Sequence, residues 1–160
     1  MPRNIKEWFM LVVSLVLAHG AGVVGAVFTV MSVATWYAFI EKPDFAPPDY
    51  LFLPVWLFLY TLIAFAFYLV WRESTWRTDV RWGIRWYVVQ LMLNALWSIL
   101  FFGLQNPAYG LIDISALFVA IAVTMVYFFR VSKVAGWLMA PYLLWVGFAG
   151  ILNYVVWILN

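Results

Sequence analysis

The stretch WFMLVVSLVLAHGAGVVGAVFTVMSVATWYAFI, residues 8–40, contains no Asp, Glu, Lys or Arg. Further uncharged runs follow at 50–71, 86–112, 114–129 and 134–160. A membrane-spanning helix needs about 20 mainly apolar residues. The runs are continuous rather than alternating, which favours helices over a membrane β-barrel. The sequence therefore predicts an all-α membrane protein, a five-transmembrane-helix bundle with helices at roughly 6–29, 50–71, 84–104, 108–129 and 135–158.

Composition supports the same class. Of 160 residues, 68% are hydrophobic and 10% are charged, whereas a soluble domain carries about 25% charged residues. The expected loops are short and no internal repeat is visible, so residues 1–160 are interpreted as one domain. Cysteine is absent, which excludes disulfide and thiol chemistry. Ala18-His19-Gly20 could end a cleaved signal peptide, but the apolar run continues far beyond the length of a signal-peptide core.

The basic residues predict an orientation. With five spans, one side of the membrane would hold Arg3, Lys6, Arg72, Arg77, Arg81, Arg85, Arg130 and Lys133, and the other side only Lys42. The positive-inside rule then places the N-terminus in the cytoplasm and the C-terminus outside. The pI near 9.0 indicates loops that meet anionic lipid, and no nucleic-acid partner is expected.

The segment between the first two helices predicts a lid. Prolines lack a backbone donor and fix φ, so residues 42–48 cannot continue a helix. A stiff loop with aromatic side chains at the membrane surface could cover a cavity; an interfacial aromatic belt is the alternative. The candidate lid residues are Trp36, Lys42, Pro43, Phe45, Pro47 and Pro48.

Polar groups at membrane depth are candidates for function or for helix–helix hydrogen bonds. Asn94, Gln90 and Asn153 fit either role. Asp113 could also lie near a helix N-terminus or pair with a loop cation. His19 could ligate a metal or haem, or simply pack with a hydrogen bond. Because no second ligand lies at metal-binding spacing, no metal site is expected.

Aromatic side chains dominate, with 11 Trp, 14 Phe and 9 Tyr. Stripes on the second, third and fifth helices could together form an aromatic-walled cavity with a few polar contacts, a composition typical of a site for a flat apolar ligand. Ordinary bundle packing is the alternative. The expected wall residues are Trp56 and Tyr60; Asn94, Trp97 and Ser98; and Tyr142, Trp145, Ala149 and Leu152.

Residues 20–25 spell G-x-G-x-x-G, but this pattern lies within a predicted membrane helix and is no dinucleotide fingerprint. The small residues Ala18, Gly22 and Ala26 instead favour close approach of a neighbouring helix. Together with Ala95 they are also candidates for a homodimer interface.

Several segments resemble the translocator protein / tryptophan-rich sensory protein (TspO/MBR, peripheral benzodiazepine receptor) family. They occur in order and at family spacing across all but the first helix. They are Trp36-Tyr37 through Lys42-Pro43 to Pro47-Pro48; Pro54-Val55-Trp56 with Tyr60; Tyr68-Leu69-Val70-Trp71; Gln90-Leu91 with Leu93-Asn94, Trp97 and Ser98; Phe101-Phe102-Gly103; Asp113; and Pro141-Tyr142 with Trp145, Phe148-Ala149 and Leu152-Asn153-Tyr154.

The resemblance implies a five-helix bundle with a pocket under the first loop. It also implies binding of protoporphyrin IX or haem as ligand, with no required cofactor, and homodimers in bacterial relatives. The family pocket positions correspond to Tyr37, Trp56, Asn94, Ser98, Trp145 and Ala149. Some members are reported to promote light- and oxygen-dependent porphyrin breakdown through two pocket tryptophans, which would be Trp56 and Trp145 here.

One departure concerns sterols. The family's mitochondrial members carry a cholesterol-recognition pattern, L/V-x-Y-x-K/R, at the end of the fifth helix, but here Tyr154 is followed by no basic residue. Such patterns are weak in any case, so a sterol partner is not favoured. A prokaryotic cell membrane is the expected location. Three functions stay open: a porphyrin receptor that senses, transports or scavenges its ligand, a porphyrin-degrading enzyme, and a sterol or lipid transporter.

Overall fold

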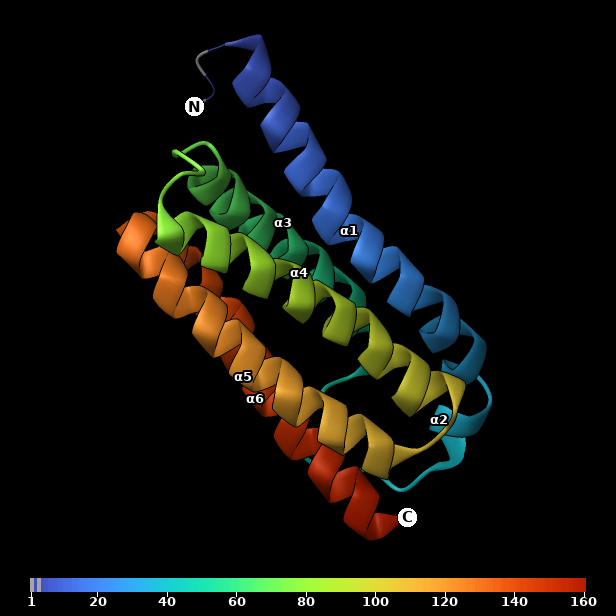
Figure 1. The fold of residues 1–160 in the computed structure, drawn as a ribbon. Helices are drawn as coiled ribbons and strands as arrows, with labels where there is room; N and C mark the ends of the chain where they lie inside the picture. The colour runs from blue at the N-terminus through green and yellow to red at the C-terminus, as the bar shows by residue number, and fades with distance from the viewer. Residues whose placement is uncertain (1, 3) are drawn as a thin grey trace.

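The computed structural model describes Pro2 and residues 4–160; Arg3, one of the basic residues used to predict orientation, lies outside this part. The chain forms α1 (Ile5–Val33), α2 (Trp36–Phe39), a 3₁₀ turn (Asp49–Leu51), α3 (Phe52–Trp71), α4 (Thr78–Ser98), a π-helical turn (Ile99–Gly103), α5 (Pro107–Val131) and α6 (Lys133–Leu159) (Figure 1). Five helical segments are long and apolar enough to cross a membrane. The predicted all-α five-helix membrane bundle is confirmed.

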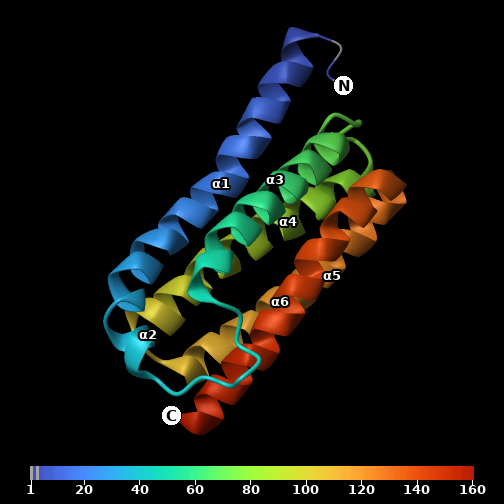
Figure 2. The same ribbon diagram turned by 180° about the vertical axis from the view of Figure 1, so that it is seen from behind.

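The five long helices form a closed ring of helix–helix contacts. Helix α1 packs against α3 and α4; α3 contacts α6, α4 contacts α5, and α5 contacts α6. Figures 1 and 2 show α1 on one side of the bundle and α5 with α6 on the opposite side. A ligand held between α1 and the α3–α4 pair would therefore lie away from α5.

Local sequence signals set the helix ends. The Asn4 side chain accepts a hydrogen bond from the backbone N–H of Glu7 (2.9 Å) and caps α1. Asn106 caps α5 in the same way, and Pro107 occupies its first turn, where no backbone donor is needed. Ser132 alone separates α5 from α6 and caps α6. These caps explain why two long helices can follow each other with so short a connection.

Two boundaries differ from the sequence prediction. Helix α1 runs to Val33 rather than 29, because residues 30–33 continue the apolar run. Helix α4 begins at Thr78 rather than 84, since charged residues such as Arg81 do not break a helix and here form its first turns outside the apolar run. The loop between α3 and α4 is correspondingly shorter than predicted.

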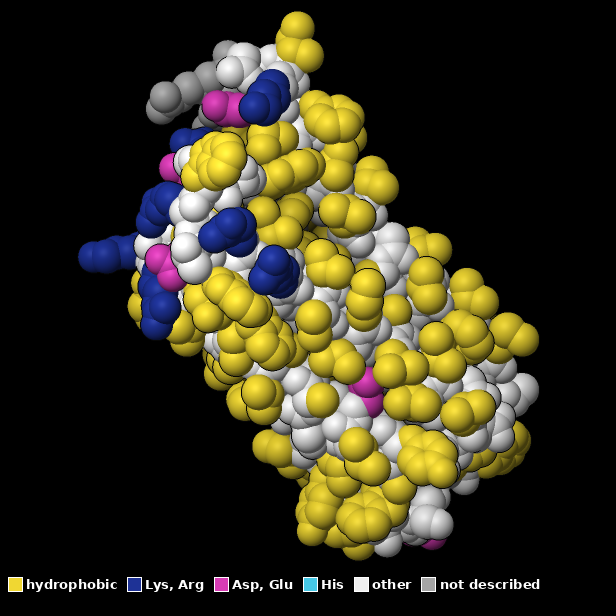
Figure 3. All heavy atoms as spheres, viewed as in Figure 1, with side chains coloured by type: hydrophobic (Ala, Val, Ile, Leu, Met, Phe, Trp, Pro, Cys, Tyr) yellow, Lys and Arg dark blue, Asp and Glu magenta, His cyan; other side chains and the backbone are white. Residues whose placement is uncertain are grey.

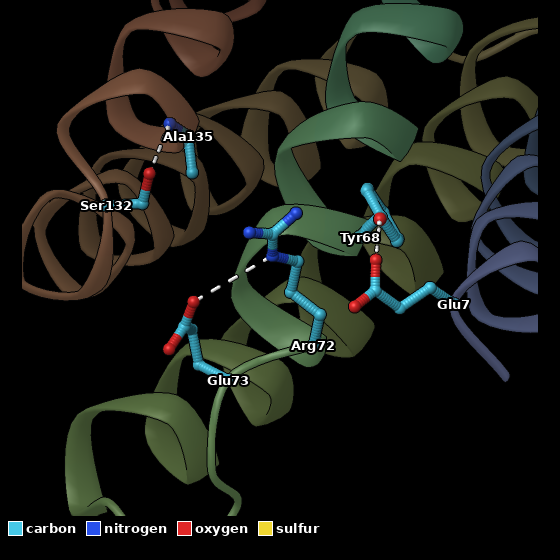
Figure 4. A network of polar contacts seen from close by, with 6 residues as sticks. All are labelled: Glu7, Tyr68, Arg72, Glu73, Ser132 and Ala135. Atoms are coloured by element: carbon cyan, nitrogen blue, oxygen red, sulfur yellow. Dashed lines mark hydrogen bonds and ion pairs between the residues drawn. The ribbon is translucent and has the colours of Figure 1, made fainter. Parts of the chain in front are cut away.

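Charged side chains gather at the end of the bundle that holds the N-terminus and the α3–α4 loop, while most of the flank seen in Figure 3 is hydrophobic. At this end Arg130 on α5 pairs with Asp79 on α4 (3.5 Å). The hydroxyl of Tyr68 on α3 donates to Glu7 on α1 (3.1 Å; Figure 4). These contacts connect the ends of neighbouring helices. The charged side chains at this end require contact with water or lipid headgroups.

Candidate ligand-binding cavity

A cavity of about 320 Å³ lies between α1, α3 and α4, in the half of the bundle next to the 34–51 segment. Its volume falls within the usual range of ligand sites, about 300–1,000 Å³. Most of its lining is apolar, and several polar groups face it. The residues that line it are His19, Gly22, Val23, Gly25, Ala26, Thr29, Val30, Val33, Tyr37, Asp49, Phe52, Leu53, Trp56, Leu57, Tyr60, Asn94, Trp97, Ser98 and Phe102.

Aromatic rings form one wall of the cavity. Trp56 and Tyr60 are one turn apart on α3, and their rings stack with centroids 5.5 Å apart. Trp97 on α4 stacks on Phe101 of the π-helical turn (5.2 Å). In this turn the backbone N–H of Leu104 donates to the Ile99 carbonyl five residues earlier (2.8 Å). π-Helical turns inside helices are frequent at functional sites.

Asn94 is the central polar group of the cavity wall. The Tyr60 hydroxyl donates to Oδ1 of Asn94, which therefore connects α3 to α4. Nδ2 of Asn94 donates to the Tyr142 hydroxyl on α6 (3.0 Å). Asn94 therefore has the helix–helix role considered from the sequence and also lines the cavity, while its contact with a ligand stays a prediction.

His19 places an imidazole in the wall on the α1 side. Its Nε2 lies 3.3 Å from the Thr61 hydroxyl, which is itself 2.8 Å from the Leu57 carbonyl. The Thr61 hydroxyl donates to the Leu57 carbonyl, so its oxygen can accept from Nε2 of His19 in the tautomer that carries the hydrogen there. Among the residues described, no group of three or more His, Cys, Asp or Glu could hold a metal ion.

The 34–51 segment closes the end of the cavity through Tyr37 and Asp49. Tyr37 is buried and packs edge-on against Phe102 (5.4 Å). Burial, and secondarily the charge of Asp49, raises the pKa of Tyr37 to about 12. On its other side, Nζ of Lys42 lies 4.1 Å from the centre of the Tyr37 ring. The cation of Lys42 is thus engaged with an aromatic face.

The segment is also tied to the end of α6. The backbone N–H of Glu41 donates to Oδ1 of Asn160 (3.0 Å), and Nδ2 of Asn160 donates back to the Glu41 carbonyl (3.0 Å). Phe45 packs edge-on against Phe148 of α6 (6.3 Å). Figure 2 shows the connection from α2 running across the bundle to α6 before it returns to α3. The segment therefore lies across the end of the bundle as a cover.

None of the six predicted lid residues lines the cavity. Trp36 packs against Phe101 (5.6 Å) beside the second pocket described below. The Pro43 carbonyl accepts from the Ala46 N–H (2.9 Å) and shapes a turn. The lid candidates form the outer layer of the cover and its attachment to α6, and Tyr37 below them meets the cavity. That they open and close stays a prediction.

The ten predicted ligand-binding residues, which are the nine wall residues and Tyr37, divide into two groups. Six line the cavity: Tyr37, Trp56, Tyr60, Asn94, Trp97 and Ser98. Tyr142 is fully buried behind Asn94, and Trp145 lies beyond Phe52, with ring centres 6.1 Å apart. Ala149 and Leu152 line a second pocket of about 30 Å³. Ligand contact by any of the ten remains a prediction.

An aromatic partition separates the two pockets. Four residues face both of them: Tyr37, Phe52, Trp97 and Phe102. Trp97 is held in place because its Nε1 donates to Oδ1 of Asn153 on α6 (3.1 Å). Nδ2 of Asn153 in turn donates to the Pro107 carbonyl (2.8 Å), which is the helix–helix role considered for Asn153.

Sequence reasoning missed the wall that α1 contributes. Eight residues of α1 line the cavity, and only His19 had been considered as a binding group. The small residues of α1 were the sequence feature that could have indicated this wall. A Cβ at Gly22 would overlap the Tyr60 ring, and one at Gly25 would crowd Ser98. Ala18 is fully buried. The predicted close approach at Ala18 and Gly22 occurs within one protomer, and the homodimer stays a prediction.

Two further buried polar groups lie outside the cavity. Both amide atoms of Gln90 and one carboxylate oxygen of Asp113 have no hydrogen-bond partner among the described residues. Asp113 lies in the second turn of α5 and is 5% exposed. It therefore lies near the N-terminus of α5, as considered from the sequence, with its side chain packed inside the bundle.

Comparison with known proteins identifies the family. The TspO/MBR family model matches residues 12–158. The chain is 48% identical over 150 residues to "Tryptophan-rich protein TspO" of Archaeoglobus fulgidus, covering 94% of this chain and 96% of that protein. The chain belongs to the TspO/MBR family. The resemblance inferred from the sequence motifs is confirmed, and it extends through most of α1 as well.

Relatives in the TspO/MBR family come from distant organisms. The human "Translocator protein" is 39% identical over 125 residues, which cover 76% of this chain and 73% of that protein. "Protein CrtK" of Rhodobacter capsulatus is 35% identical over 140 residues, with 88% and 86% of the two chains covered. Family membership and five apolar helices together make this chain a multi-pass membrane protein.

Proposed function

We propose that this chain is a membrane receptor for flat, apolar tetrapyrroles, with protoporphyrin IX or haem as the ligand, and that it senses, transports or scavenges them. The observation that carries the proposal is the cavity itself. It combines the stacked Trp56–Tyr60 pair with the polar edge of Asn94 and Ser98. Stacking and apolar burial would supply the affinity, and the amide and hydroxyl groups would fix the orientation.

Titration of the purified protein with protoporphyrin IX tests this proposal. Binding should quench tryptophan fluorescence and shift the Soret band with saturation at one site. Trp56→Ala should weaken binding by about 1–2 kcal/mol, since it removes a stacking face. Trp137→Ala is the matched control, because this tryptophan lies on the surface of α6 outside the cavity. Unsaturable quenching, or equal loss in both variants, would contradict a specific site.

A second candidate function is light- and oxygen-dependent breakdown of the bound porphyrin. The position of Trp56 in the cavity wall favours it, because an indole that carries radical chemistry has to contact the pigment. Trp145 would reach the pigment only past Phe52. Trp56→Phe keeps an aromatic face and should retain affinity within about 1 kcal/mol while it abolishes light-driven loss of the pigment. If this variant bleaches the pigment at the wild-type rate, the enzymatic function is contradicted and only the receptor function is supported.

A sterol or lipid transporter remains the third alternative. It predicts that protein in liposomes accelerates transfer of a fluorescent sterol, and that excess protoporphyrin IX inhibits the transfer. Without such acceleration, the tetrapyrrole receptor is the simpler account of the cavity.

We further propose a location in a prokaryotic cell membrane, and the charge distribution supports an orientation with the N-terminus in the cytoplasm. The described basic residues of one end are Lys6, Arg72, Arg77, Arg81, Arg85, Arg130 and Lys133, and Lys42 lies at the other end. A reporter fused after Asn160 should therefore be active only outside the cytoplasm. A C-terminal reporter that reads cytoplasmic would overturn this orientation.

A further inference from the structure

The cavity is open at its side, between α1 and α3. Four lining residues form this rim, and all of them are largely exposed on the flank of the bundle: Val23 (65%), Val30 (74%), Leu53 (65%) and Leu57 (49%). In a membrane this flank faces acyl chains. We propose that the ligand enters and leaves through this window from the bilayer, not through the cover formed by residues 34–51; the inference rests on the proposed tetrapyrrole-receptor function.

The cover is fastened at both of its margins. Tyr37 is packed against the rings of Phe101 and Phe102. On the far side, Glu41 and Asn160 exchange two hydrogen bonds, each of 3.0 Å. Opening this route would break the paired bonds and expose a buried aromatic cluster. The four rim residues of the window are Val and Leu, whose side chains form no hydrogen bonds that passage would have to break.

Charge favours the same route. The cover carries the carboxylates of Glu41, Asp44 and Asp49, and Asp49 lines the cavity end. Its one cation, Lys42, lies against the Tyr37 ring. A tetrapyrrole bearing carboxylates would meet like charge there. The rim of the window is composed of Val and Leu side chains, which suit an apolar macrocycle.

The depth of the window also fits such a ligand. Val30 lies in the last turns of α1, and Leu53 lies in the first turn of α3. The window is therefore close to the end of the bundle where headgroups lie. A porphyrin dissolved in the bilayer could keep its carboxylates at the headgroup level while its ring moves sideways into the cavity.

Uptake kinetics test the route. Val30→Trp would narrow the window, and Val27→Trp is the matched control, since Val27 is lipid-exposed on the same helix but does not line the cavity. Protein in liposomes is mixed with vesicles that contain protoporphyrin IX, and quenching is followed in time. We expect Val30→Trp to slow association about tenfold, a barrier increase of ~1.4 kcal/mol, and to slow dissociation as well, whereas a loss of ligand contacts alone would speed dissociation. Val27→Trp should match the wild type.

The cover is tested separately with a disulfide. The chain has no cysteine, so Glu41→Cys with Asn160→Cys introduces a single pair that can fasten the cover to α6. Oxidation of this pair should leave the uptake rate unchanged. Slower uptake after oxidation, or a wild-type rate in Val30→Trp, would overturn the route. If the wild type itself does not bind protoporphyrin IX at equilibrium, the proposed function fails and the route with it.

Discussion

The hydroxyl of Tyr60 on α3 donates a hydrogen bond to Oδ1 of Asn94 on α4, and the same amide donates to Tyr142 on α6. Asn94→Leu would remove both bonds and leave two buried hydroxyl groups without their partner. We expect a loss of about 1–2 kcal/mol of unfolding free energy, because single bonds of this kind contribute modestly in membranes. Equilibrium unfolding in SDS measures this difference in unfolding free energy between the variant and the wild type.

Gln90→Leu is the control on the same helix. Gln90 is completely buried and neither amide atom has a partner among the described residues. Replacing it with an apolar side chain should leave stability unchanged or raise it by up to about 1 kcal/mol. If Gln90→Leu destabilises as much as Asn94→Leu, the hydrogen bonds of Asn94 are not the source of its effect.

Gly22 and Gly20 give a contrasting pair on α1. A Cβ at Gly22 would overlap the Tyr60 ring, whereas Gly20 has open space around it. Gly22→Ala should displace Tyr60, weaken the Tyr60–Asn94 bond and lower protoporphyrin IX affinity several-fold. Gly20→Ala should bind normally and gain up to about 1 kcal/mol of stability, because alanine favours a helix interior. Parallel titrations and unfolding curves distinguish the two outcomes.

His19 offers a test that separates haem from metal-free porphyrin. It is the only histidine of the chain, and it lines the cavity. If its imidazole ligates the iron, His19→Ala should shift the Soret band of the haem complex and weaken haem binding, with protoporphyrin IX affinity unchanged. Equal losses for both ligands would indicate that His19 contributes packing and its bond to Thr61.

Alkaline pH should weaken the cover through Tyr37. Its pKa is raised from 10.0 to about 12, by burial first and then by Asp49, while Lys42 lies over its ring. The folded state favours the neutral phenol. The contribution of Tyr37 to the unfolding free energy is therefore complete below pH 10. It is then lost as the pH rises towards 12, in total about 2–3 kcal/mol.

Tyr37→Phe removes this titration and is the reference. Unfolding free energies of both proteins, measured between pH 8 and pH 12, should run parallel up to about pH 10, and only the wild type should then lose the additional stability of Tyr37. Parallel curves up to pH 12 would show that Tyr37 ionises without cost in the folded protein.

Membrane physics made the fold predictable from the sequence. Uncharged runs near 20 residues can satisfy their backbone in lipid only as helices, so five runs specify five helices. The proline-rich residues 42–48 predicted a non-helical cover. Five of the residues expected on one cavity wall do line the cavity: Trp56, Tyr60, Asn94, Trp97 and Ser98. These residues follow regular helical spacing, which can be read along the chain.

Tertiary packing decided which helices close that space. Membrane helices are apolar around their whole circumference, so no polar face marks the side that faces a neighbour. The sequence therefore did not show that α1 forms a wall, although Gly22 leaves room for Tyr60. Nor did it show that Phe52 and Trp97 stand between the cavity and Leu152 on α6. Such choices depend on contacts between residues far apart in the chain, and only the assembled bundle determines them.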